Sequence, residues 1–173
     1  MEGETEVTIR PADENDVKNI ASTYVHNHRT TYKDLLPGEY FQTLTEEYAV
    51  KKWSDYIADA SNRVWIAEDE YGFLGFAASM SDEELDGVWY LDSLHVCEKA
   101  RGKGVGTALI KTVGRYASDN GFGKMSICIV KGNDNAGALY CKLGARHYKD
   151  FTGEMSLSEK LLWNDLKIFS EKL

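Results

Sequence analysis

The sequence contains few cysteines and few prolines and no long hydrophobic run. The scarcity of cysteine and the lack of a long hydrophobic run each exclude a class of protein. Among its 173 residues are 3 cysteines and 2 prolines. The cysteines form no C-x-x-C pair and are odd in number, so we expect neither a disulfide framework nor a zinc or other metal site. No apolar stretch is long enough to span a bilayer, and the opening MEGETEVTIRP has no hydrophobic signal segment. We therefore expect a protein of the reducing cytoplasm that has no membrane partner.

Basic residues are outnumbered by acidic ones, which bears on the partners. The formal net charge is −8, from 20 Lys and Arg against 28 Asp and Glu. An acidic surface repels the phosphate backbone, so we expect no nucleic-acid partner, and a small cationic substrate fits better. The chain is 43 % hydrophobic and shows no repeat, low-complexity tract or linker. These features predict one folded domain over residues 1–173.

The first half of the chain predicts a strand, two helices and a hairpin, in that order. Val7–Arg10 alternates as a strand, and Asp13 or Asn15 can cap the helix that follows. Thr45 caps a second helix, whose apolar residues recur at helical spacing up to a break at residues 61–62. The period then changes to two, and RVWIAED, EYG and FLGFAASM predict two strands joined by a turn.

The next predicted strand, VWYLDSLHV, loses its alternation in the middle. Trp89 and Leu91 share one face, but the apolar residues after them are Leu94 and Val96. The alternation therefore slips by one position around Asp92. A β-bulge would restore the register and bend the strand there, and bulges often adjoin active sites. A strand with one irregular side chain is the alternative, and the sequence alone does not separate the two.

Three glycines in ARGKGVGTALI follow this strand and lead into a helix with one apolar stripe. The next segment, KMSICIV, is apolar on both faces, as in a central strand. Strand, helix and strand at this length form a βαβ crossover, so the sequence predicts an α/β protein in which these two strands are parallel. The glycines lie where free N–H groups and the helix dipole favour an anion.

Two common phosphate-binding motifs do not fit these glycines. A P-loop is excluded because no lysine stands between Gly106 and Thr107. A dinucleotide fingerprint is excluded because its third glycine position is occupied by Thr107 or Leu109, depending on the starting glycine.

Three motifs, in the right order, resemble the GNAT N-acetyltransferase family. The hexapeptide RGKGVG at 101–106 is similar to the [RQ]-x-x-G-x-[GA] loop that wraps the pyrophosphate of acetyl-CoA. LDSLHV resembles the bulged fourth strand of the family, and NDNAGALYCKLGARHY resembles its closing Asn-Tyr helix. The resemblance implies the GNAT acyl-CoA N-acyltransferase fold, an α+β arrangement with a mixed central sheet, a bulged fourth strand and helices on both faces.

The same resemblance implies acetyl-CoA as cosubstrate and a set of residues that bind it. The pantetheine arm would lie along the backbone of the strand, and the pyrophosphate along the loop and helix start. The implied contacts are Leu94, His95 and Val96, then Arg101, Gly102, Lys103, Gly104, Val105, Gly106 and Thr107. Glycines allow close approach of the backbone and a positive φ where it is needed. Asn133 is either a pantetheine contact or the cap of its helix.

The reaction that the resemblance implies is direct attack of a primary amine on acetyl-CoA in a ternary complex. Tyr140 would be the acid that protonates the leaving thiolate, although a core tyrosine is the alternative. Asp92 is a candidate base, directly or through a water relay. His95 has the better intrinsic pKa, yet alternation with its apolar neighbours points it to the opposite side. The main-chain N–H of Leu94 is a candidate donor to the oxyanion.

The resemblance implies that the first two helices and the hairpin loops form the acceptor side. His28 and Tyr32, with Asp34, are candidate lining residues, and a small-molecule or peptide amine is the expected substrate. A homodimer is left open. The alternative to an enzyme is a non-catalytic acyl-CoA-binding sensor or interaction module on the same fold. The sequence does not identify the amine.

Overall fold

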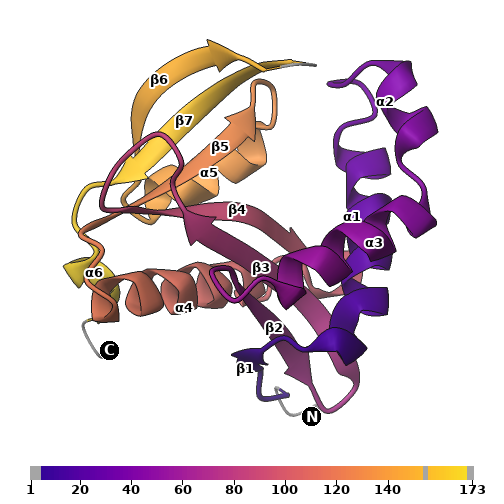
Figure 1. Ribbon diagram of the computed structural model, residues 1–173, viewed down its shortest axis with the longest axis horizontal. Helices are drawn as coiled ribbons and strands as arrows, with labels where there is room; N and C mark the ends of the chain where they lie inside the picture. The colour runs from indigo at the N-terminus through magenta and orange to yellow at the C-terminus, as the bar shows by residue number, and fades with distance from the viewer. Residues whose placement is uncertain (1–4, 154–155, 171–173) are drawn as a thin grey trace.

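The computed structural model describes residues 5–153 and 156–170, which form a seven-stranded mixed sheet. The strand order is β1-β2-β3-β4-β5-β7-β6, and β4 and β5 run parallel while the other neighbours run antiparallel (Figure 1). The strands are β1 (Thr8–Pro11), β2 (Arg63–Asp69), β3 (Gly72–Ser81), β4 (Val88–Val96), β5 (Lys124–Val130), β6 (Arg146–Thr152) and β7 (Leu157–Trp163). The expectation of a mixed sheet and a parallel βαβ pair is confirmed.

Helices cover both faces of this sheet, as expected (Figure 1). On one face, α1 (Val17–Thr31) and α3 (Glu46–Ala58) pack on β2 and β3 around Trp53 and Phe76. On the other face, α4 (Val105–Asp119) and α5 (Asp134–Lys142) form a larger core with β4, β5 and β7. The remaining described elements are α2 (Gly38–Thr43), α6 (Lys167–Ser170) and the 3-10 turns η1 (Glu14–Asp16) and η2 (Glu98–Ala100).

The strand β4 carries the bulge that its slipped alternation suggested. In the ladder with β3, Ala78 pairs with Ser93 and Ser79 pairs with Leu91, so Asp92 has no partner opposite it. The ladder between β4 and β5 ends at Leu91, just before the bulge. An extra residue bends its strand and interrupts pairing. The bulge is confirmed, and it opens the sheet between β4 and β5.

The helix starts agree with the sequence better than the helix ends. Thr45 caps α3 by accepting the Tyr48 N–H at 3.1 Å. Asp13 caps η1 by accepting the Asn15 N–H at 2.8 Å, so Asn15 is not the cap. The helix α3, which is the second helix predicted from the sequence, ends at residue 58, earlier than the predicted break at residues 61–62. It ends there because Asp59 leaves the helical conformation and its carboxylate accepts the N–H of residue 61.

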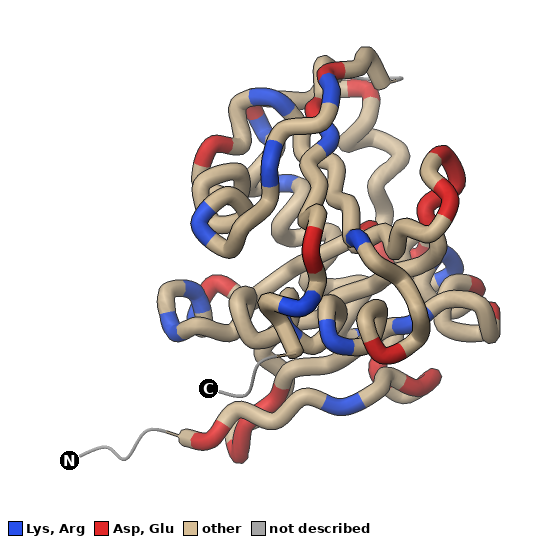
Figure 2. Tube along the Cα trace, turned by 90° about the vertical axis from the view of Figure 1, so that its left-hand side faces the viewer, with Lys and Arg blue, Asp and Glu red and all other residues tan. Residues whose placement is uncertain are grey.

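Charged residues of both signs are interspersed along the described trace (Figure 2). One buried pair ties the acidic loop after β3 to the far half of the sheet. Lys160 of β7, which is 5 % exposed, lies 2.8 Å from Asp82, and Asp82 also accepts the Ser126 hydroxyl of β5.

No helix among the described residues is long and apolar enough to cross a bilayer.

Candidate active site

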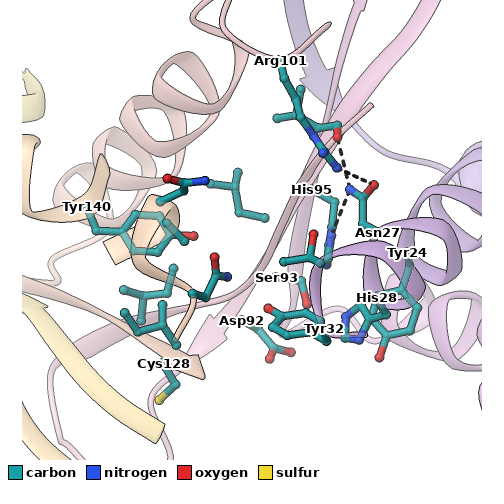
Figure 3. Close-up of a pocket in the computed structure, with 18 of the residues that line it drawn as sticks. Tyr24, Asn27, His28, Tyr32, Asp92, Ser93, His95, Arg101, Cys128 and Tyr140 are labelled. Carbon is teal, nitrogen blue, oxygen red and sulfur yellow. Dashed lines mark hydrogen bonds between the residues drawn. The ribbon is translucent and has the colours of Figure 1, made fainter. Parts of the chain in front are cut away.

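A cavity of about 450 Å³ lies where the sheet opens between β4 and β5 (Figure 3). Its walls come from α1 and α3, from the second half of β4 with Arg101, from the end of β5 and from the start of α5. The two parallel strands part after the bulge, so residues that would otherwise face a neighbouring strand are left to line the cavity.

The glycine loop turns the chain from β4 into α4 beside this cavity. Gly102 and Gly104 have φ values of +77° and +82°, in the left-handed region that favours glycine. Gly104 is the N-cap of α4, and its carbonyl accepts the Ala108 N–H at 3.0 Å. The N–H groups of residues 105–107 precede this first helical hydrogen bond, so they have no partner within the helix. They point out of its N-terminus, where an anion is favoured. The expected positive φ is confirmed for two of the three glycines.

There is free space beside the backbone of this loop, where the packing of the protein would allow a side chain. A Cβ atom on Gly104 would meet nothing within 4 Å. A Cβ atom on Gly106 would lie 3.7 Å from Leu139 and 3.8 Å from Val96, which is ordinary contact. Crowding within the protein therefore does not require either glycine, and the open backbone is available to a ligand.

Asn27 of α1, which the sequence did not mark as functional, joins the glycine loop to β4. Its side chain is buried, and its Oδ1 accepts the Arg101 guanidinium at 2.9 Å. Its Nδ2 donates to the Val96 carbonyl at 3.1 Å and lies 3.4 Å from the His95 Nδ1. Because both ends of the amide have partners, Asn27 fixes the direction of Arg101 (Figure 3).

His95 lies on the α1 side of β4, as its alternation with its neighbours predicted. Leu94 and Val96 pack against the core that contains α4. The His95 ring instead stacks on Phe76, with centroids 5.4 Å apart, and contacts Tyr24 edge to face at 5.6 Å. His95 is therefore a packed residue that also lines the cavity.

His28 and His95 are neighbouring imidazoles with low pKa values. Burial lowers the pKa of His28 to about 4, with the charge of Lys52 acting in the same direction. Burial lowers the pKa of His95 to about 3, and His28 and Arg101 add to this effect. The Tyr40 hydroxyl lies 2.7 Å from the His28 Nδ1. Both rings are therefore neutral at physiological pH.

Asp92, the bulge residue, places a half-buried carboxylate in the cavity wall (Figure 3). Burial raises its pKa, while the charge of Lys52 opposes the rise. A carboxylate with a raised pKa accepts a proton more readily than an exposed one.

Tyr140 of α5 lies across the cavity from Asp92, with its hydroxyl directed into the cavity (Figure 3). The side chain is 6 % exposed and its ring contacts Trp163 edge to face, with centroids 6.0 Å apart. Burial raises the pKa of the phenol above its ordinary value, so the hydroxyl keeps its proton at neutral pH. Tyr140 is thus both a core residue and a cavity residue.

The structure brings most of the predicted site residues together. Those that line the cavity are His28, Tyr32, Asp92, Leu94, His95, Val96, Arg101, Asn133 and Tyr140. The residues from Gly102 to Thr107 do not line it and lie beyond Arg101 along the loop and helix start. Asn133 occupies the N-cap position of α5, but its side chain makes no capping bond, so the cap role is not supported. Asp34 is exposed and does not line the cavity.

A separate polar group lies on β6 and β7, away from this cavity. One potential ligand atom each from His147, Asp150 and Glu159 lies within 4.8 Å of the others. Asp150 is also paired with Lys131 at 2.9 Å. The Lys131 ammonium group therefore already pairs with one of the carboxylates that a metal ion would need. These residues form an ion-pair network at the surface.

Comparisons with known proteins agree on one family. A family model described as "Acetyltransferase (GNAT) family" matches residues 25–145. The chain is 30 % identical over 132 residues to the uncharacterized N-acetyltransferase YuaI of Bacillus subtilis, with 73 % of each chain covered. It is 34 % identical over 64 residues to the thialysine N-epsilon-acetyltransferase of Sus scrofa, which covers 37 % of this chain and 38 % of the relative.

A solved structure has the same fold. The PaiA N-acetyltransferase from Thermoplasma acidophilum, in complex with coenzyme A, superposes with a TM-score of 0.76 over 90 % of this chain and 98 % of that chain, at 16 % identity.

Proposed function

This chain belongs to the Acetyltransferase (GNAT) family and transfers the acetyl group of acetyl-CoA to an amine, and we propose that the cavity between β4 and β5 holds both reactants. One observation carries the proposal: a carboxylate, Asp92, and a protonated phenol, Tyr140, line opposite walls of one cavity. A base and an acid on either side of one reaction centre are what aminolysis of a thioester needs.

Acetyl-CoA lies with its pyrophosphate on the glycine loop and its pantetheine arm in the opening of the sheet. The free N–H groups of residues 105–107 and the guanidinium of Arg101 favour the phosphate charges. The pantetheine amides bond the backbone of Leu94–Val96, because β5 no longer pairs with β4 beyond the bulge. Asn133 lines the same cavity and contacts the arm from the side of α5.

Transfer starts with a neutral amine. An alkyl amine has a pKa near ~10, so its proton must pass to a base, and Asp92 accepts it directly or through a water. The amine nitrogen then bonds to the thioester carbon, and the carbonyl oxygen takes the negative charge. The main-chain N–H of Leu94, next to the bulge, donates to that oxygen.

Collapse of this intermediate breaks the carbon–sulfur bond. The sulfur leaves with the electron pair, and the Tyr140 hydroxyl gives it a proton, so that the products are the N-acetylated amine and the free thiol of coenzyme A. The nitrogen loses its second proton through water to the phenolate, and Asp92 releases the first proton to solvent, so both groups return to their starting states. Because the pKa of Tyr140 is raised, it is protonated at the start of every cycle.

The histidines are weaker candidates for the base. With pKa values of about 4 and about 3, His28 and His95 hold a proton poorly. The His95 Nδ1 also lies beside the Asn27 amide. We therefore assign them to the wall on the acceptor side, with Tyr32, and assign the base role to Asp92.

The experiment is to mix the protein with acetyl-CoA and a panel of amines, and to measure both free thiol and the acetylated product by mass spectrometry. The expected result is equal amounts of the two products from at least one amine, with Asp92→Asn and Tyr140→Phe slowed. If acetyl-CoA raises the Tm but no amine yields product, the protein is instead a non-catalytic acyl-CoA-binding module.

The same proposal places the enzyme in the cytoplasm, in keeping with three cysteines that are all free in the structure. A homodimer stays a prediction.

A further inference from the structure

The acceptor side of the cavity contains two opposite charges that do not touch. Among the described residues that line the cavity, Asp92 is the one carboxylate, and the cations are Arg101 and Lys52. Arg101 is bonded to Asn27 at the end of the cavity next to the glycine loop. Lys52, on α3, is therefore the cation available to an acceptor.

Lys52 has no carboxylate partner within the described part of the chain, where no acidic oxygen lies within 4.0 Å of its ammonium group. Its sequence neighbour differs, because Lys51 pairs with Asp55 at 2.8 Å on the exposed face of α3. The Lys52 ammonium instead lies over the rings of Tyr24 and Trp53, at 5.9 Å and 5.4 Å from their centroids. These two aromatic rings hold the half-buried lysine at the cavity wall.

The charge of Lys52 acts on the cavity from this position. It lowers the pKa values of both Asp92 and His28, which lie on different walls. Glu83 also acts on Asp92, from the loop after β3, but it is exposed and does not line the cavity. An acceptor that enters between α1 and β4 therefore meets one positive and one negative group.

We propose that the acceptor amine also bears a free carboxylate, as an amino acid or short peptide does, with its carboxylate on Lys52 and its amine on Asp92. This inference rests on the proposed function and specifies its substrate class. A polyamine would find a single carboxylate in the lining and would be repelled by Lys52. An amine without a carboxylate would leave Lys52 without an acceptor once bound, which is unfavourable for a charge removed from water.

This assignment differs from what the whole chain suggests. A net charge of −8 favours a cationic substrate, but the lining that the substrate contacts has a different balance of charge from the whole surface. Local charge within a partly enclosed site outweighs distant surface charge, which salt screens.

The test compares kcat/KM for acceptors with and without the carboxylate: phenylalanine, phenylalanine amide and phenethylamine, with spermidine as the polyamine. The wild type is expected to prefer phenylalanine over its amide by about 10-fold to 100-fold, as for one charge-assisted contact. Lys52→Met keeps the unbranched stem against the two rings and is expected to bring that ratio close to one. Lys51→Met, on the same helix but outside the cavity, should keep the wild-type ratio.

The wild-type ratio decides the matter even if Lys52→Met does not fold. Turnover of these amines without a preference for the carboxylate, or a preference that survives in Lys52→Met, overturns this inference and leaves the proposed function in place. Absence of turnover with every amine overturns the proposed function and this inference together.

Discussion

The two walls of the cavity are built in different ways. The proposed cofactor wall is one continuous segment of mainly backbone N–H and C=O groups, which runs from Leu94 to Arg101 along the cavity and on to Thr107 in the loop beyond it. The acceptor wall is assembled from side chains of α1 and α3, among them His28 and Lys52, which approach β4 only in the folded chain. We therefore expect substitutions on the proposed acceptor wall to affect the choice of amine more than the binding of acetyl-CoA.

The largest effect is expected at Asp92, where the two walls meet. We expect Asp92→Asn to lower kcat/KM by roughly 10²- to 10⁴-fold, because the amine loses its proton acceptor. Acetyl-CoA affinity should change little, since the cofactor wall uses backbone groups. Steady-state kinetics and a titration with acetyl-CoA measure the two quantities. Asp86→Asn, on the exposed loop before β4, is the matched control.

The pH profile sharpens this prediction. Because the pKa of Asp92 is raised in the folded protein, wild-type kcat/KM should rise with pH through that pKa, and the rise should be absent in Asp92→Asn. The folded state holds this proton more tightly than the unfolded state, so ionisation at neutral pH costs stability. Asp92→Asn should therefore have a higher Tm than the wild type at pH 7. A lower activity with a flat pH profile in both proteins would contradict the base role.

Tyr140→Phe is expected to have the next largest effect and tests the α5 side of the cavity, across from Asp92. Loss of the hydroxyl should lower kcat by about 100-fold, because the thiolate must leave without an acid. The ring and its contact with Trp163 are kept, so Tm and acetyl-CoA affinity should stay close to wild type. Tyr148→Phe, an exposed tyrosine on β6, serves as the control. Wild-type kcat in Tyr140→Phe would show that the phenol is only a core residue.

His28 tests the acceptor wall through the dependence of stability on pH. Its folded pKa of about 4 lies below the unfolded value, so the unfolded state takes up the proton first as the pH falls. We expect this residue alone to cost about 2 kcal/mol of unfolding free energy between pH 7.5 and pH 5. His28→Gln should reduce that acid sensitivity, measured by urea unfolding at both pH values. His26→Gln, at an exposed position on the same helix, is the matched control.

The smallest effect is expected at Gly104. Its φ of +82° means that Gly104→Ala should destabilise the protein by about 1 kcal/mol through strain, since the new Cβ has free space around it. The same change should weaken acetyl-CoA binding, because the methyl group narrows the approach to the N–H groups of α4. Gly123→Ala, where φ is not positive, is the control for both measurements. Unchanged affinity in Gly104→Ala would place the pyrophosphate elsewhere.

The sequence indicates the irregular strand and the glycine loop through local signals, and the structure contains both features. The slip in the period of two around Asp92 indicated either a bulge or one irregular side chain, and the pairing with β3 shows the bulge. The anion-binding loop follows from glycines before a helix. Tyr140 needed the family resemblance, because a tyrosine on a helix beside leucines is otherwise an ordinary core residue.

The acceptor wall was less visible for a physical reason. Polar residues on helices usually face water, and nothing near Asn27 or Lys52 in the sequence says which ones turn inward. The position of Asn27 could have been inferred from helical spacing, since it continues the buried stripe that includes Tyr24 on α1. The position of Lys52 could not be inferred in this way, because its ammonium group is held by the rings of Tyr24 and Trp53, which belong to two different helices.

The last two strands were also missed. β6 is largely exposed and shows no apolar face. β7 has a buried lysine, Lys160, in its middle, and its partner Asp82 lies far away in the sequence. A pairing of this kind compensates a buried charge, but it interrupts the apolar pattern from which a strand is predicted.

The most direct test of the account is a crystal structure of the protein with bound coenzyme A. We expect the pyrophosphate to lie on the N–H groups of residues 105–107, pantetheine to lie along Leu94–Val96, and the sulfur to lie beside the Tyr140 hydroxyl. Coenzyme A bound outside the opening between β4 and β5, or a sulfur far from both Tyr140 and the bulge at Asp92, would contradict it.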